Sequence, residues 1–148
     1  MNLNWNLDKL FLSFESDDFI NALSECKTTS ESFNATIEIL LNSNQSESKK
    51  IESYLNILIE FKEIFSPVAS FASLSFSTDS SNNKALETIQ TLQTLDTKTV
   101  SGIVLFEKWL SSLANIDDII NSSEFLKEHN FQIKQIIIRS KYLLDPNI

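Results

Sequence analysis

The chain has 148 residues, of which 42% are hydrophobic and 10% aromatic, and this composition predicts a folded domain with an apolar core. One glycine and two prolines are too few for the tight turns of a multi-stranded β protein, so the composition excludes that class. Twenty acidic and twelve basic residues give a net charge of −8. A chain of this charge repels phosphate backbones and anionic lipid heads, so we expect neither nucleic acid nor a membrane as its partner.

The first predicted helix begins after Ser16, with Asp17 and Asp18 in its first turn, where carboxylates favour the positive end of the helix dipole. Its apolar positions recur in steps of four and three, which predicts one long helix facing a partner helix. These positions are Phe19, Leu23, Cys26, Ser30, Phe33, Ile37 and Leu40. Residues 28–30 are weak helix formers, so a break at this point is the alternative to one long helix. The polar stretch 42–48 predicts a loop.

The second predicted helix begins near Ser48 and has two apolar faces, so we expect it to be central and packed on both sides. The main face comprises Ile51, Tyr54, Leu58, Phe61, Phe65, Val68 and Ala72, and the other face comprises Ile57, Ile64 and Phe71. Pro67 lacks a backbone donor and clashes with the carbonyl of Glu63, so the sequence predicts a kink or a restart near Ser66.

A polar turn follows Phe76, and a third helix is predicted from Asn83 to Leu113. Its apolar residues are Leu86, Ile89, Leu92, Leu95, Val100, Ile103, Phe106, Leu110 and Leu113. The only glycine of the chain, Gly102, lies inside this helix at a cost of about 1 kcal/mol relative to alanine. The expected compensation is the close approach of a neighbouring backbone.

Three shorter helices are predicted at 117–121, 123–129 and 131–144, and Asp145-Pro146 ends the last one. No internal repeat, linker or change of composition divides the chain. The sequence therefore predicts an all-α fold, a single helical domain over residues 1–148, in which long antiparallel helical hairpins form a bundle-like lobe.

The sequence assigns no catalytic, cofactor-binding or metal-binding residue. His129 is the only histidine, whereas a zinc site needs three or four ligands and a nucleophilic Cys26 needs a base. We interpret His129 as a surface or helix-end residue and Cys26 as a thiol in a helix core. A lone glycine excludes the glycine-rich nucleotide loops.

Charged pairs have the same structural interpretation. Asp17-Asp18 and Asp117-Asp118 are helix-start carboxylates, and Lys49-Lys50 is interpreted as a solvated turn. The sequence has neither a secretory signal nor an apolar run long enough to cross a bilayer, and Cys26 cannot form an internal disulfide. We therefore expect a cytoplasmic location.

Three segments resemble the N-terminal region of oligoendopeptidase F, a bacterial M3-type zinc metallopeptidase that cleaves short peptides. Trp5–Phe11 is similar to the family's W-x-L-x-x-L-[FY] opening, and Ser70–Asp79 to its Y-A-x-L-x-x-x-x-D helix end. Phe125–Leu144 resembles the close of that lobe through Phe131, Ile136, Arg139 and the ending Tyr142-Leu143-Leu144. Tyr142 stands where the family usually has histidine.

The resemblance implies that this chain is the N-terminal helical lobe of a larger peptidase and walls one side of an enclosed peptide cleft. The family's H-E-x-x-H motif and zinc lie in a C-terminal catalytic domain, which would follow Ile148, so no catalytic or zinc residue is carried over. The implied partners are that catalytic domain and an oligopeptide substrate. A stand-alone helical interaction module is the alternative, because the long apolar stripes would equally pair between chains. A small helical enzyme is a third, weaker hypothesis.

Overall fold

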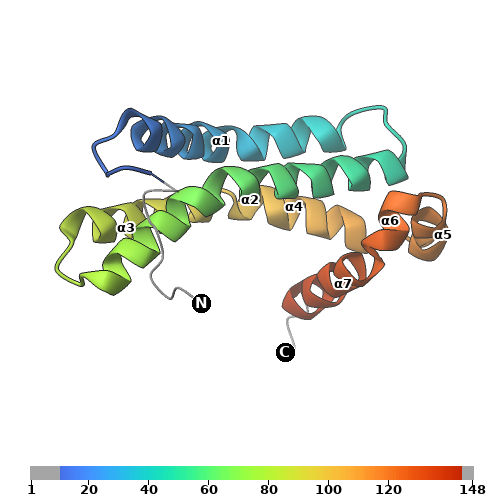
Figure 1. Ribbon diagram of the computed structural model, residues 1–148. Coiled ribbons are helices and arrows are strands. Elements are labelled where there is room, and N and C mark those ends of the chain that lie inside the picture. The colour runs from blue at the N-terminus through green and yellow to red at the C-terminus, as the bar shows by residue number, and fades with distance from the viewer. Residues whose placement is uncertain (1–10, 145–148) are drawn as a thin grey trace. The chain divides into compact units, whose positions relative to one another are not determined.

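The computed structural model describes residues 11–144, and these residues form helices joined by short turns, without a strand (Figure 1). This confirms the all-α, bundle-like fold. The four longer helices of the first three-quarters of the chain are α1 (Asp17–Leu41), α2 (Glu47–Thr78), α3 (Asn83–Thr97) and α4 (Val100–Ser111). Two short helices, α5 (Ile116–Asn121) and α6 (Glu124–Glu128), precede α7 (Asn130–Leu144). The predicted opening motif and the stop at Asp145-Pro146 fall largely or wholly outside the described residues.

Helix α1 begins where the sequence predicts, because the Ser16 hydroxyl accepts a hydrogen bond from the Phe19 N–H at 3.4 Å. The helix continues through residues 28–30 without a break. The predicted apolar face is confirmed, since Phe19, Cys26, Ser30, Phe33, Ile37 and Leu40 are buried and Leu23 is partly buried.

Helix α2 runs without interruption through Pro67, so the predicted restart near Ser66 is wrong. Phe65 and Val68, on either side of the proline, are both buried in the same core as Phe71. Burial of each such side chain stabilises by about 1.5–3 kcal/mol, and together they outweigh the hydrogen bond that Pro67 cannot make.

The Lys49-Lys50 pair is not a solvated turn, because both residues lie in the first turns of α2. Lys50 Nζ donates to the Leu41 carbonyl oxygen at 2.8 Å, and it lies 5.7 Å from the centre of the Trp109 ring. The Leu41 carbonyl is one of those left without an intrahelical partner at the end of α1. Lys50 is therefore a structural cation, since it caps α1 from the next helix.

The predicted third helix is in fact two helices, because α3 ends at Thr97 and α4 begins at Val100. The buried Ser30 hydroxyl donates to the Leu95 carbonyl oxygen at 2.5 Å, and the Lys98 N–H, three residues after Leu95, donates to the same oxygen at 3.2 Å. A side chain from another helix thus takes part in satisfying a carbonyl at the point where the helix stops. The predicted apolar face is correspondingly wrong at Leu86 and Val100, which are exposed, whereas Ala85 and Thr88 are buried.

The chain contains two compact units, and α1 and α2 contribute residues to both. Unit 1 comprises residues 11–32 and 59–99, and unit 2 comprises residues 33–58 and 100–144. The single domain over residues 1–148 stays a prediction.

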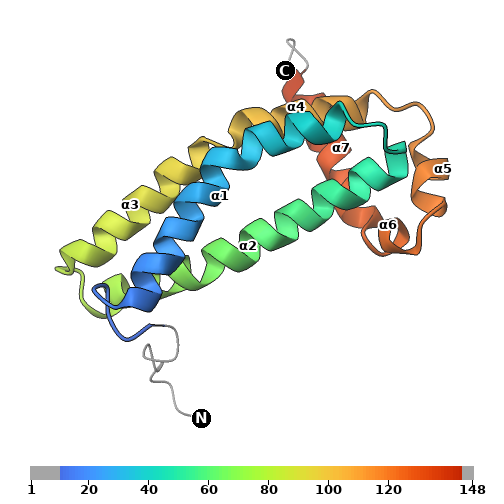
Figure 2. The same cartoon turned by 90° about the horizontal axis from the view of Figure 1, so that it is seen from above.

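Unit 1 is a core of α1, α2 and α3 around aromatic side chains. Phe11, Phe19 and Phe71 pack edge to face or tilted, with ring centres 5.4–5.7 Å apart, and Phe14 joins them at 4.7 Å from Phe71. Cys26, Val68, Leu92 and Leu95 complete the buried cluster. In Figure 2 these three helices can be followed by their labels.

Unit 2 is centred on Tyr54 of α2 and Phe106 of α4, both almost inaccessible, whose rings stack at 3.8 Å. Helix α4 packs against α7, and α6 packs against both α5 and α7. Leu126, Ile133, Ile136 and Ile137 close this core from the C-terminal helices. The three predicted short helices are thereby confirmed, with bounds within one residue of the prediction.

Glu52 connects α2 to the start of α6 within unit 2. The Ser123 hydroxyl donates to Glu52 Oε1 and accepts the Leu126 N–H at 3.3 Å, and Lys49 Nζ lies 3.1 Å from Glu52 Oε2. The hydrogen bond from Ser123 is the main cause that holds the pKa of Glu52 below its ordinary value, and Lys49 acts in the same direction.

This contact predicts a pH-dependent difference between the wild type and Glu52→Gln. Because folding lowers the pKa of Glu52, its stabilisation is present above the ordinary glutamate pKa of about 4.3 and is lost as pH falls through the folded-state pKa. Urea unfolding at pH 7 should therefore find Glu52→Gln less stable than the wild type, with the difference shrinking toward pH 3. The control is Glu38→Gln, at an exposed position of α1 in the same unit. A difference that does not change with pH would contradict the prediction.

Candidate functional site

Unit 2 has a groove of about 440 Å³ between α2, α4 and α7. We call it the α7 groove. It is lined by Tyr54, Leu58, Ile103, Glu107, Phe131, Gln132, Gln135, Ile136 and Arg139.

Tyr54 forms a rigid wall of the α7 groove. Its ring is stacked on Phe106, and its residue is 1% exposed. Burial, and then the nearby Glu107 carboxylate, raise the pKa of Tyr54 above its ordinary value, so the hydroxyl stays protonated and available as a donor. A stacked, buried aromatic ring gives the groove a fixed shape.

One ion pair lies in the α7 groove, between Glu107 of α4 and Arg139 of α7. The Glu107 side chain is 7% exposed and the Arg139 side chain is 60% exposed. A guanidinium has five N–H donors, so Arg139 holds the buried carboxylate while still presenting donors to the groove. This arrangement suits a carbonyl or carboxylate oxygen of a ligand.

The rim of the α7 groove combines apolar and amide side chains on α7. Phe131 is 78% exposed, and Gln132 and Gln135 are also exposed. Side-chain amides both donate and accept, which matches the backbone of an extended peptide. Among the described residues that line the groove, Glu107 is the one carboxylate, and it is paired with Arg139.

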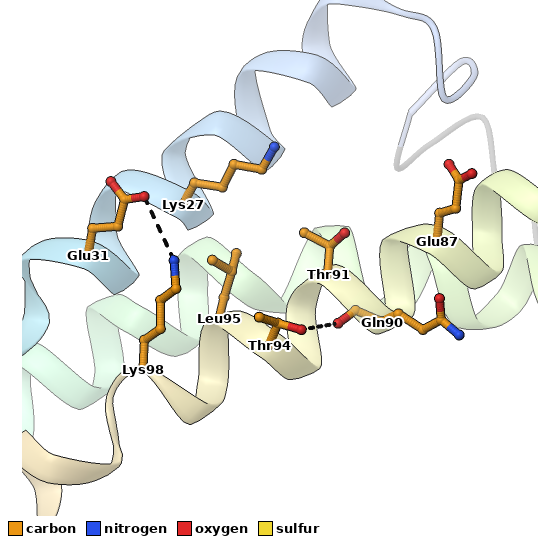
Figure 3. Close-up of a pocket in the computed structure, with 8 residues that line it drawn as sticks. All are labelled: Lys27, Glu31, Glu87, Gln90, Thr91, Thr94, Leu95 and Lys98. Carbon is orange, nitrogen blue, oxygen red and sulfur yellow. Dashed lines mark hydrogen bonds and ion pairs between the residues drawn. The ribbon is translucent and has the colours of Figure 1, made fainter.

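A second groove lies in unit 1 between α1 and α3, with a volume of about 500 Å³ (Figure 3). Glu31 of α1 and Lys98, the residue that follows the end of α3, face one another, with Lys98 Nζ 4.0 Å from Glu31 Oε1, and Lys27 of α1 also lines the groove. Glu87, Gln90, Thr91 and Thr94 line its α3 side. Two lysines and two glutamates balance, so this groove carries no net charge that would select a ligand.

Cys26 and His129, the two residues that the sequence analysis weighed for chemistry, line neither groove. Cys26 is fully buried, and its thiol donates to the Ile64 carbonyl oxygen at 3.6 Å. Burial, and then the nearby Glu25, raise the pKa of Cys26 to about 11, so it is a protonated core thiol as predicted. His129 caps the end of α6, with Nδ1 2.8 Å from the Phe125 carbonyl oxygen. This confirms it as a helix-end residue.

The two aspartate pairs also lie where the sequence places them. Asp17 and Asp18 are in the first turn of α1, and Asp117 and Asp118 in the first turn of α5, where Asp117 pairs with Lys134. Sequence reasoning missed the pairing of Glu107 with Arg139. Its only signal is a glutamate at an apolar-face position of α4, one residue after Phe106, and that signal does not identify the partner.

Within residues 11–144, no group of three or more histidine, cysteine, aspartate or glutamate side chains is placed to hold a metal ion. No helix in that range combines the length and apolar character needed to cross a bilayer. Searches for related proteins find no match among known protein families, curated proteins or solved structures.

Proposed function

We propose that this chain is the noncatalytic N-terminal helical lobe of a zinc-dependent oligoendopeptidase, and that the α7 groove forms part of the wall of its peptide cleft. The observation that carries the proposal joins sequence and geometry. Phe131, Ile136 and Arg139, three of the residues on which the resemblance to oligoendopeptidase F rests, line one groove. The other described segment of the resemblance contributes Phe71 and Ala72 to the core of unit 1, where they support the fold.

The chemistry of the α7 groove supports a peptide as its ligand. Leu58, Ile103 and Phe131 supply apolar contact area for a peptide side chain. The amides of Gln132 and Gln135 suit peptide N–H and C=O groups. Arg139, held by Glu107, suits a backbone carbonyl or a terminal carboxylate. In this proposal the lobe binds and orients the peptide, while zinc and the H-E-x-x-H residues belong to the catalytic domain after Ile148, in a cytoplasmic enzyme.

Sequencing the transcript past the codon for Ile148 tests the assignment directly. We expect an open frame of several hundred codons that contains H-E-x-x-H. A stop codon directly after Ile148, or a long frame without that motif, would refute the proposal. The chain of residues 1–148 alone should show no zinc-dependent cleavage of a fluorogenic oligopeptide.

The role of the α7 groove is tested in the full-length protein with Gln132→Ala. Loss of one hydrogen bond to the peptide, worth about 1 kcal/mol, should raise KM for a fluorogenic oligopeptide about fivefold with kcat unchanged. Ile39→Ala, at an exposed position of α1, is the matched control. An unchanged KM in Gln132→Ala would remove the groove from the peptide cleft while leaving the family assignment standing.

A stand-alone helical protein-protein interaction module is the second candidate function. It is favoured by apolar side chains exposed on α4 and α7, namely Val100, Val104, Phe131 and Ile138. Light scattering distinguishes the two candidates, because a dimer that persists over a wide concentration range supports the module and a monomer argues against self-pairing through these helices.

A further inference from the structure

Helix α7 exposes a narrow apolar stripe that the fold of unit 2 does not use. Phe131, Ile138 and Tyr142 are 78%, 60% and 61% exposed, and Gln135, between them, is also exposed. These positions are spaced i, i+4, i+7 and i+11, so they lie along one face of the helix. We call these four residues the outer seam of α7.

The other side of α7 holds the helix in place. Ile133, Ile136, Ile137 and Ser140 are buried, and α7 packs against α4 and α6. The outer seam is therefore presented on a fixed helix, and a partner would not have to order it first.

Three basic side chains flank the outer seam. Helix α7 carries Lys134, Arg139 and Lys141 and no acidic residue, in a chain whose net charge is −8. By helical spacing, Lys134 and Lys141 lie on one side of the seam and Arg139 on the other. Lys134 and Arg139 pair with Asp117 and Glu107, whereas Lys141 has no ion-pair partner among the described residues. Even the paired cations keep exposed surface, since their side chains are 38% and 60% exposed.

We propose that the outer seam of α7 binds an amphipathic helix of a partner polypeptide whose own apolar seam is flanked by carboxylates. The seam is one residue wide and repeats like the contact line of two paired helices, whereas a helix that lies on a membrane presents a broad apolar face. Gln135 places one polar group in the seam, and such a group sets the register of helix pairing. Opposite charges beside an apolar contact line add specificity and speed association. The outer seam shares Phe131 and Gln135 with the α7 groove, and the proposal does not use the peptidase assignment.

Two synthetic three-heptad peptides test the proposal with the chain in solution. Both carry the same leucine seam, and their flanking positions are all glutamate in one and all lysine in the other. Fluorescence anisotropy should find the glutamate peptide bound about tenfold more tightly than the lysine peptide, with the ratio falling as salt is raised. Ile138→Ser should weaken binding of the glutamate peptide about tenfold. Lys141→Glu should reduce the preference for glutamate.

The controls separate the outer seam from other surfaces. Ile39→Ser, at an apolar α1 position in the same unit that is 72% exposed, should bind the glutamate peptide as the wild type does. Equal affinity for both peptides, no binding of either, or binding that survives Ile138→Ser would each overturn the proposal. So would binding to phosphatidylserine vesicles, or self-association of the chain, if Ile138→Ser abolished it, because the occupant would then be a membrane or a second copy.

Discussion

Gly102→Ala is expected to destabilise unit 2 by about 2 kcal/mol, although alanine is the better helix former. A Cβ at position 102 would stand 2.5 Å from Asn34 Oδ1 and 3.2 Å from both Asn34 Cα and Phe33 Cδ1. The Gly102 N–H, which has no intrahelical partner in the first turn of α4, donates to Asn34 Oδ1 at 2.9 Å. The added methyl group displaces this cap and overpacks the α1 contact, at about 1–3 kcal/mol, and this exceeds the gain in helix propensity of about 1 kcal/mol.

Urea denaturation followed by fluorescence measures this effect in unit 2. In a Trp5→Phe background Trp109 is the only tryptophan, and its ring lies 5.2 Å from that of the buried Phe106. Asn34→Ala alone should cost about 1 kcal/mol for the lost cap. The double variant should lose less free energy of unfolding than the two single variants lose together, because the closest clash is with Asn34 Oδ1. A Gly102→Ala chain as stable as the wild type would show that α1 does not approach α4 this closely.

Arg139→Met should also destabilise unit 2 by about 2 kcal/mol. It keeps most of the side-chain volume but leaves the Glu107 carboxylate, whose side chain is 7% exposed, without its cation. Removing one partner of a buried pair costs about 3–5 kcal/mol, and the 60% exposure of Arg139 lowers that figure here.

The matched control is Lys134→Met on the same helix. Lys134 pairs with Asp117, whose side chain is 75% exposed, so this change should cost less than about 1 kcal/mol. Arg139→Met combined with Glu107→Gln should recover part of the lost stability, because the uncompensated charge is gone. Equal effects of Arg139→Met and Lys134→Met in urea denaturation would refute a special role for the buried pair.

Local pattern was sufficient to predict the start of α1, its full length, its buried face and the three C-terminal helices. Periodicity reports the burial of a face because successive turns of one helix meet the same neighbour. The single glycine also identified a close backbone approach in advance, since a helix keeps glycine at its cost mainly where a Cβ does not fit. Asn34 Cα beside Gly102 confirms that expectation.

Pattern failed where the deciding group comes from a distant part of the chain. The break between α3 and α4 involves Ser30 on α1, which donates to the Leu95 carbonyl oxygen. The sequence predicts that Lys50 lies in a solvated turn, whereas in the structure its Nζ donates to the Leu41 carbonyl oxygen at the end of α1. Continuous helix through Pro67 likewise depends on a core to which Phe65 and Val68 both belong.

The candidate site also combines features that the sequence predicts with features that only the tertiary structure shows. Sequence by itself determined an acidic all-α chain with a single histidine and a single glycine, because these depend on composition and on repeats within a few turns. Only the tertiary structure decided that Tyr54, Glu107 and Arg139 line one groove, and that Phe131, Ile138 and Tyr142 stay exposed on a packed helix. Contacts between residues 32 or more positions apart leave no periodic trace in a single sequence, since the pairing depends on how the helices pack and not on their spacing along the chain.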